Sequence, residues 1–162
     1  MSTTGGFTSS GLLQEELLLT LPALDVAGAV EIGEITKSFG TQRSLPIAVE
    51  VRVGDWAVYH ASLPGSTPEN DWWIGRKARV VKLKKHSTMY ERVLAEECGI
   101  DWHKENNLLD ETHAIHGGGL PLITKSDGLV GVLLISGLPQ VDDHLLGVEV
   151  LTEFLARKGE LL

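Results

Sequence analysis

The sequence is poor in cysteine and has no long apolar run. Cys98 is the only cysteine, so no internal disulfide can form, and we expect a reducing compartment, the cytoplasm, as the location. No apolar stretch approaches the roughly 20 residues that a membrane helix needs. The first six residues also lack the basic and then apolar segments of a secretory leader. We therefore expect no membrane partner.

An excess of positive charge is also absent. The chain carries 22 acidic and 14 basic side chains, for a net charge of -8, whereas nucleic-acid binding needs a clustered cationic face. We therefore expect no nucleic-acid partner. The basic residues are uneven, however, because six of the 14 lie within residues 76–85, where there is no acid. We expect this basic cluster on the outer side of an amphipathic helix, facing solvent or a partner.

The length and composition fit a single domain. With 162 residues, of which 43% are hydrophobic, the chain can build one core but is too short for two ordinary domains. Residues 1–11 are rich in Ser, Thr and Gly, and we expect them to form a flexible tail. Residues 12–162 are expected to form the domain.

Five segments have helical signals, each with a cap residue before it or a helix breaker after it. They are Leu12–Leu21 before Pro22, residues 25–40 with Asp25 as the cap, the basic helix after Asn70 or Asp71, residues 88–98 with a Thr88–Glu91 capping box, and residues 142–158 with Asp142 as the cap. The basic helix buries Ile74, Ala78 and Val81. The last helix has one apolar stripe, formed by Leu145, Val148, Leu151 and Leu155. Residues 100–115 are predicted to form a loop or an irregular helix.

Four segments are typical of strands. Residues 47–53 alternate between apolar and other side chains, and Gly54-Asp55 separates them from a second strand at 56–61, as in a hairpin. Asp127-Gly128 likewise separates residues 120–124 from residues 129–135. The last run is apolar at nearly every position, which predicts a strand covered on both faces. The sheet is therefore expected to be a middle layer.

Histidines beside glycine turns are the first candidate site. His113 and His116 lie at a spacing compatible with a metal or an acidic cofactor, although a histidine at a frayed helix end gives the same pattern. Gly117 and Gly118 let the backbone approach a ligand or turn amides toward an anion, whereas a tight turn into a strand explains them equally. The glycine run matches neither a P-loop nor a dinucleotide fingerprint.

A second group of candidates lies at the start of the last helix. Asp142 and Asp143 suit the positive end of a helix, which leaves His144 as the residue that capping does not require. His60 and Trp72-Trp73 lie close in sequence to the basic helix and could line the same pocket, or could be ordinary core and surface residues.

Several separate blocks resemble a branch of the GlcG/HbpS-like superfamily over roughly residues 12–157. These blocks are His60-Ala61-Ser62-Leu63-Pro64-Gly65, Asn70, Trp73-Ile74, Arg76-Lys77, Arg79-Val80-Val81, His116-Gly117-Gly118-Gly119, Ser136-Gly137-Leu138-Pro139-Gln140 and Asp143-His144. The resemblance implies an α+β fold that is profilin-like, with three α/β/α layers around a mainly antiparallel five-stranded sheet. It also implies compact homo-oligomers, and a superfamily label of haem degradation with some relatives that bind haem or related tetrapyrroles.

The resemblance points to site candidates residue by residue: His60, Arg76, His116, Gly117, Gly118, Asp143 and His144. The function we expect is a cytoplasmic, oligomeric protein that binds an anionic small molecule, with haem as the cofactor that the resemblance suggests. In this hypothesis His116 and His144 share one cavity with His60, and Arg76 or Lys77 pairs with the anion. The alternatives are a non-enzymatic assembly or adaptor protein acting through its oligomer and its basic helix, and a small-molecule enzyme using Asp143 and His144. The sequence leaves open whether any reaction is catalysed.

Overall fold

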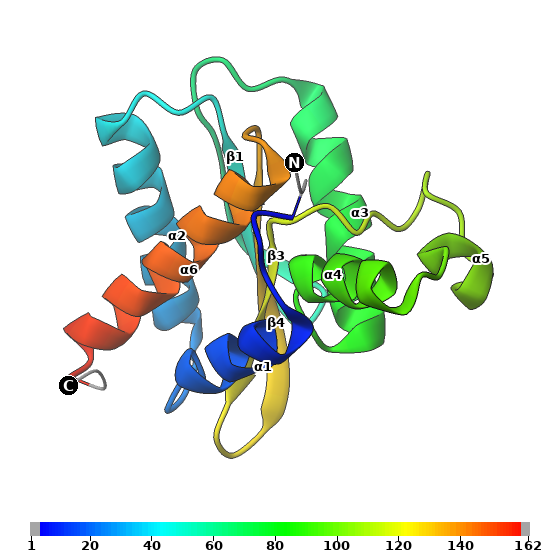
Figure 1. The fold of residues 1–162 in the computed structure, drawn as a ribbon. Coiled ribbons are helices and arrows are strands. Elements are labelled where there is room, and N and C mark those ends of the chain that lie inside the picture. Colours follow the sequence, from blue (N-terminus) through cyan, green and yellow to red (C-terminus); the bar gives the residue numbers. More distant parts are fainter. Residues whose placement is uncertain (1–3, 160–162) are drawn as a thin grey trace.

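The computed structural model describes residues 4–159, which form one antiparallel sheet with helices on both faces (Figure 1). Within these residues there are six helices and four strands: α1 Ser9–Leu18, α2 Val26–Gln42, β1 Ala48–Val53, β2 Trp56–Ser62, α3 Pro68–Lys84, α4 Thr88–Cys98, α5 Trp102–Asn106, β3 Gly119–Thr124, β4 Gly128–Ser136 and α6 Gln140–Arg157. None of the helices in this part of the chain is long and apolar enough to cross a membrane.

The sheet has the strand order β2-β1-β4-β3, and every neighbouring pair is antiparallel. The expectation of five strands is wrong for the described residues, because only four are present. Beside β3, where a fifth strand could lie, Leu21 forms a single bridge with Thr124. Pro22 follows at once and has no amide hydrogen to continue the pairing.

The sheet is the middle of three layers, as its continuous apolar strand predicted. Helices α2 and α6 cover one face, and α3 with α4 lies on the other side (Figure 1). The first face holds the larger core, in which Val49 and Val51 of β1 meet Ile32 of α2. On the second face, Ala48 packs with Ile74 of α3 and Leu134 of β4. Successive β1 residues thus serve opposite layers, as the period of two requires.

Helix starts differ from the sequence predictions because earlier residues supply the caps. Helix α1 begins at Ser9, where the Thr8 side chain accepts from the Gly11 amide at 3.1 Å, so residues 9–11 of the expected tail are helical. Thr67 precedes α3, and Asn70 completes its capping box rather than acting as the cap itself. Ser87, not Thr88, caps α4. Residues 1–3 of the expected tail lie outside the described residues.

Helix α6 follows Pro139, so Asp142 is in the first turn and is not the cap. Its buried side also differs from the predicted stripe. Leu151 and Leu155 are buried as expected, but Leu145 is 46% exposed. The prediction started the stripe at the wrong leucine, since Leu146 is the one that packs into the core.

The expectation that the basic residues of α3 all face outward is also wrong. The apolar positions Ile74, Ala78 and Val81 are buried as predicted, yet the Arg76 and Lys77 side chains are only 1% and 2% exposed. Lys77 lies three residues after Ile74 and four before Val81, so it belongs to the sheet-facing stripe. The segment after α5 and two tryptophans cover Arg76.

Candidate functional site

A groove of about 310 Å³ lies where the end of β4, the first half of α3 and the start of α6 meet. Most of its lining is polar. The lining residues are Glu69, Asn70, Trp73, Lys77, His116, Ser136, Gly137, Leu138, Gln140 and Asp143. Three of the predicted site residues, Lys77, His116 and Asp143, therefore share this groove.

A buried ion pair forms the inner wall of the groove. Lys77 Nζ donates to the Ile135 carbonyl at 2.8 Å and to Asp143 Oδ2 at 3.3 Å. The other Asp143 oxygen accepts from the Leu138 amide at 3.0 Å. Burial lowers the pKa of Lys77, and burial raises the pKa of Asp143 to about 6, although Lys77 opposes that shift.

Gly118 makes room for the ion pair. Its φ of +123° is unfavourable for other residues, and a Cβ there would lie 2.7 Å from Lys77 Nζ and 2.3 Å from the Ile135 oxygen. Gly117 approaches α6 equally closely, and its amide donates to Gln140 Oε1 at 3.3 Å. The Gly119 amide donates to Thr88 Oγ1 at 3.0 Å. These two amides serve the protein's own turn, so the tight-turn interpretation applies to them.

His116 is the uncommitted polar group of the groove. Its ring lies 4.6 Å from the Trp73 ring, centroid to centroid, in an edge contact. Burial, with a smaller contribution from Arg92, lowers the pKa of His116 to about 4, so the imidazole is neutral near pH 7. Its Nδ1 is buried, and neither ring nitrogen has a hydrogen-bond partner within residues 4–159. A neutral imidazole of this kind can accept a hydrogen bond or ligate a metal.

The prediction that His116 and His144 share a cavity is wrong. His144 is 1% exposed, and its Nε2 lies 2.7 Å from Glu15 Oε1 of α1. It lines a separate small recess beneath α1. Successive helix residues point about 100° apart, so Asp143 faces the groove while His144 faces α1. The residues between α5 and β3 are not helical, so His113 and His116 are not paired on a helix face either.

His60 also lies outside the groove. It is on the exposed side of β2, where its Nδ1 is 3.1 Å from Glu50 Oε1 and its Nε2 is 3.3 Å from Ser62 Oγ. Its Nε2 also lies 3.4 Å from Asp71 Oδ1 of α3, so His60 contacts β1, its own strand and the first turn of α3, but it does not line the groove with His116.

Arg76 supports the groove from behind and does not line it. Its guanidinium lies 4.0 Å from the Trp72 ring centroid and 4.2 Å from that of Trp73. Its Nε donates to the Asp110 carbonyl at 2.7 Å, and Nη2 is 2.9 Å from Asp110 Oδ2, an ion pair without hydrogen-bond geometry. Arg76 therefore ties the segment before β3 to α3 and holds Trp73 beside His116.

Sequence reasoning missed the burial of Lys77 and the roles of Glu69 and Gln140 in the lining. The signal for Lys77 was its place on the apolar stripe of α3, because a lysine there must find a buried partner. No comparable signal marks Glu69. In the part of the chain that the structure describes, no three His, Cys, Asp or Glu side chains are arranged to hold a metal ion.

The antiparallel sheet with helices on both faces, and a polar groove at the end of β4, define a small α+β protein with one buried ion pair beneath a ligand-sized opening. A family model described as "Haem degrading protein HbpS-like" matches residues 24–152. The chain belongs to this HbpS-like family, which confirms the resemblance found in the sequence.

Relatives and solved structures agree with this membership. The chain is 38% identical over 143 residues to a UPF0303 protein of Streptomyces avermitilis, covering 88% of each chain. It is 35% identical over 153 residues to a UPF0303 protein of Rhizobium johnstonii, covering 94% of each. The fold is similar to that of Ybr137w, with a TM-score of 0.84, 24% identity and coverage of 91% and 88% of the two chains. It is also similar to PduOC in a complex with haem, with a TM-score of 0.64, 17% identity and coverage of 79% and 94%.

Proposed function

We propose that the chain is a cytoplasmic, homo-oligomeric protein that binds a small anionic molecule in the groove, and that haem or a related tetrapyrrole is this molecule. The observation that carries the proposal is the neutral, unpartnered imidazole of His116 beside Trp73. The family description and the haem complex of a structural neighbour name the ligand class. The single cysteine agrees with a reducing compartment.

His116 suits one part of a haem site. Haem iron is commonly held by a neutral imidazole, and the low pKa of His116 keeps this ring neutral over the physiological range. Trp73 and Leu138 supply apolar surface at the same groove. Bound haem would supply an iron centre able to exchange electrons, while the chain would orient it through His116 and exclude water with Trp73.

The propionate side of haem has no free cation in the groove of a single chain. Lys77 is the one cation among the lining residues, and it already bonds to Asp143 and Ile135. Glu69 adds a negative charge. At about 310 Å³ the groove is at the small end of ligand pockets. Haem binding in this groove therefore requires a second copy at the open side that supplies the missing enclosure and charge.

A hemin titration tests the proposal. We expect the purified protein to shift the hemin Soret band, and the shift to be lost in His116→Ala. His60→Ala is the matched control, because it removes an exposed histidine outside the groove and should leave the shift intact. A wild-type protein that gives no shift, or a His116→Ala variant that still gives the full shift, would overturn haem binding through this residue.

One observation also favours the enzyme alternative, in a changed form. Asp143 and His144 do not act as a pair here, since His144 bonds to Glu15. Asp143 beside Lys77 nevertheless has its pKa raised to about 6, as a general acid or base needs. The rate of a reaction in the groove would depend on the protonation of a group that titrates near this pH. This pH dependence would vanish in the Asp143→Asn variant. The adaptor alternative loses support, because Arg76 and Lys77 are buried.

A further inference from the structure

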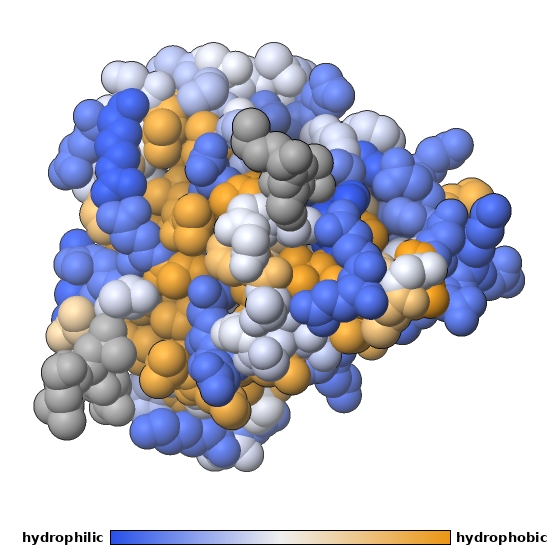
Figure 2. Space-filling model, in the orientation of Figure 1, coloured by the Kyte–Doolittle hydropathy of each residue, from blue (hydrophilic) through white to orange (hydrophobic). Residues whose placement is uncertain are grey.

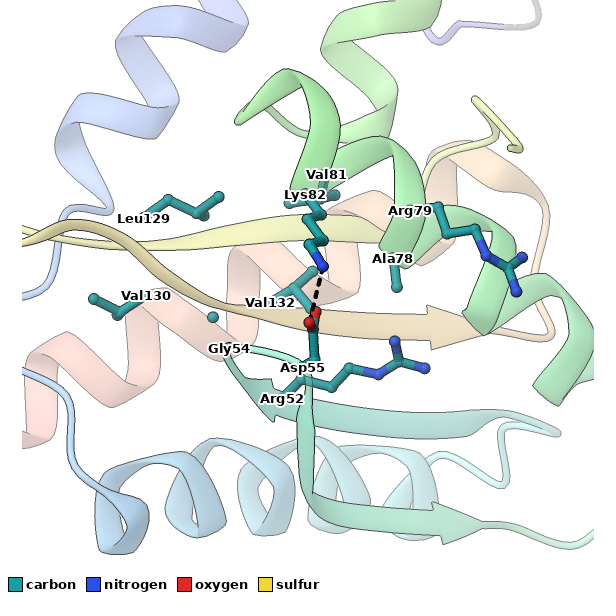
Figure 3. A pocket seen from close by; sticks show the side chains of 11 residues that line it. Arg52, Gly54, Asp55, Ala78, Arg79, Val81, Lys82, Leu129, Val130 and Val132 are labelled. Atoms are coloured by element: carbon teal, nitrogen blue, oxygen red, sulfur yellow. Dashed lines mark hydrogen bonds and ion pairs between the residues drawn. The ribbon is translucent and has the colours of Figure 1, made fainter. Parts of the chain in front are cut away.

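A second and larger hollow, of about 440 Å³, lies at the other end of α3. It opens between the second half of this helix, the start of β4 and the turn that joins β1 to β2 (Figure 3). It has no lining residue in common with the groove at His116. The two openings therefore offer separate sites.

Small apolar side chains create the space. In this half of α3 the sheet-facing residues are Ala78 and Val81, and Val132 of β4 lies beneath them. Figure 3 shows the Ala78 methyl group pointing into the hollow. Leu129 is only partly buried and continues this floor. Ala78, Val81 and Val132 are at most 6% exposed. The apolar surface that a ligand can still cover is therefore that of the half-buried Leu129 and Val130, and burying it would stabilise a complex.

The rim of the hollow is positively charged in a chain whose net charge is -8. Arg52, Arg79 and Lys82 line it, with Asp55 as the one acidic residue. Arg52 bonds to Glu50 through Nε at 2.5 Å, and neither of its Nη atoms has a partner in the described chain. Arg79 uses only Nη1, which donates to the Thr112 carbonyl at 3.0 Å. Donors therefore remain for an anion.

Asp55 holds the position that a ligand anion would take. Its Oδ2 lies 2.8 Å from Lys82 Nζ, and Figure 3 shows the two side chains meeting across the hollow. The Asp55 and Lys82 side chains are 74% and 70% exposed, and ion pairs this exposed contribute little to stability. An anion from outside can therefore replace Asp55 at Lys82 without a large loss.

We propose that this hollow binds an organic anion with a compact apolar body, such as an aromatic or short-chain carboxylate, sulfonate or phosphate. The apolar body covers Leu129 and Val130, and the charged group replaces Asp55 at Lys82, within the positive field of Arg52 and Arg79. An apolar floor with a few charged groups at its rim is typical of small-molecule sites in general.

Two fluorescent probes test the site with the full-length protein. Anilinonaphthalenesulfonate (ANS) is an organic anion, and N-phenylnaphthylamine has a similar apolar body without the charge. We expect ANS to bind with one-to-one stoichiometry and to weaken with added salt, because screening reduces the attraction of exposed charges. The neutral probe should bind more weakly and independently of salt.

Three substitutions have different expected effects. Lys82→Ala should weaken ANS binding by about threefold, because a charge pair at an exposed lysine contributes less than about 1 kcal/mol. Asp55→Asn should tighten ANS binding by about threefold, because it removes the competing carboxylate at a weak exposed pair. Ala78→Phe should block both probes by filling the hollow. Lys37→Ala is the control, since Lys37 is exposed on α2 and far from the lining.

Lys82 and Asp55 are surface residues, so their variants test the site even if Ala78→Phe does not fold. ANS affinity that is unchanged in Lys82→Ala, or weakened in Asp55→Asn, would overturn the proposal. So would stoichiometric displacement of ANS by hemin, because the two sites would then be one. Loss of ANS binding as the protein associates would also overturn the proposal, because another copy would then occupy the hollow. Failure of hemin to bind, with these ANS results intact, would overturn only the proposed function.

Discussion

Two residues of the groove have pKa values that shift so as to give opposite dependences of stability on pH. The pKa of Asp143 rises to about 6, and the pKa of His116 falls to about 4. Both shifts come mainly from burial, which disfavours the charged form of each group. Over the same acidic range, ionisation of Asp143 costs stability as the pH rises, and protonation of His116 costs stability as the pH falls. In the wild-type protein the two effects partly cancel.

Asp143→Asn should expose the first effect. Between the unfolded pKa of 3.8 and the folded value of about 6, the folded chain holds a proton that the unfolded chain has lost. Stability from this residue is thus present below pH 3.8 and lost as the pH rises through 6. Relative to the variant, the wild type should lose up to about 3 kcal/mol of unfolding free energy over this range. Urea unfolding at a series of pH values measures it, and a constant difference would contradict the prediction.

His116→Gln should show the opposite slope. The unfolded pKa of 6.5 exceeds the folded value of about 4, so acid protonates the unfolded chain first. The stability present above pH 6.5 is lost as the pH falls toward 4. The variant should therefore resist acid better than the wild type in the same urea series. A His116→Gln variant that loses as much stability in acid as the wild type would contradict the prediction.

For single residues, the sequence identified the functional side chains of the groove but not the residues that they contact. Lys77, His116 and Asp143 were all candidates, and the structure brings them to one groove. The error over His144 arose because adjacent residues of α6 face different elements. No local pattern in the sequence shows that Glu15, far away along the chain, will bond to His144.

Among the elements, two helices differ in how closely they approach their neighbours. In α2, a Cβ at Gly33 would lie 2.3 Å from Tyr59 Cγ of β2, whereas a Cβ at Gly75 of α3 would meet nothing within 4 Å. Gly33→Ala should therefore destabilise the protein by about 1–3 kcal/mol through overpacking. Gly75→Ala should stabilise it by roughly 0.5–1 kcal/mol, because alanine favours the helix. Thermal unfolding of the two variants checks both signs, and equal shifts would contradict the account.

The existence of the main elements was predictable, and so was the start of α2 at its cap Asp25, whereas the starts of the other long helices were not. The alternation in residues 47–53 and the apolar run in 129–135 led correctly to β1 and β4. The cap residues were harder to predict, because acidic or polar residues a few positions after Thr8, Thr67 and Ser87 are also suitable helix caps. The choice between neighbouring caps depends on how each helix packs, which local sequence does not reveal.

For the whole molecule, the layered α+β arrangement and the four strands followed from the residue pattern, and only the expected count of five was wrong. The count came from the resemblance, whereas Pro22 limits this chain to one bridge beside β3. The face that carries α1, α2 and α6 has extensive apolar surface (Figure 2). Leu17 and Leu18 are 75% and 73% exposed there. Exposed apolar areas commonly mark interaction sites.

Light scattering should therefore find an assembly at micromolar concentration, with a mass that is a multiple of 17.6 kDa. Dilution should shift the protein toward smaller species if the contacts are of ordinary strength. A particle that keeps the mass of one chain at all concentrations would contradict the proposed homo-oligomer. Salt provides a second variable, since an interface of apolar side chains is less sensitive to screening than one of ion pairs.

The edge contact between Trp73 and His116, at 4.6 Å between ring centroids, has an optical consequence. A protonated imidazole quenches the emission of an adjacent indole, so the intrinsic fluorescence of Trp73 should fall as acid titrates its neighbour. A ligand seated on the imidazole would alter the same emission. The chain thus carries a built-in spectroscopic reporter at the opening where its ligand is proposed to bind, and occupancy can be followed without attaching a dye.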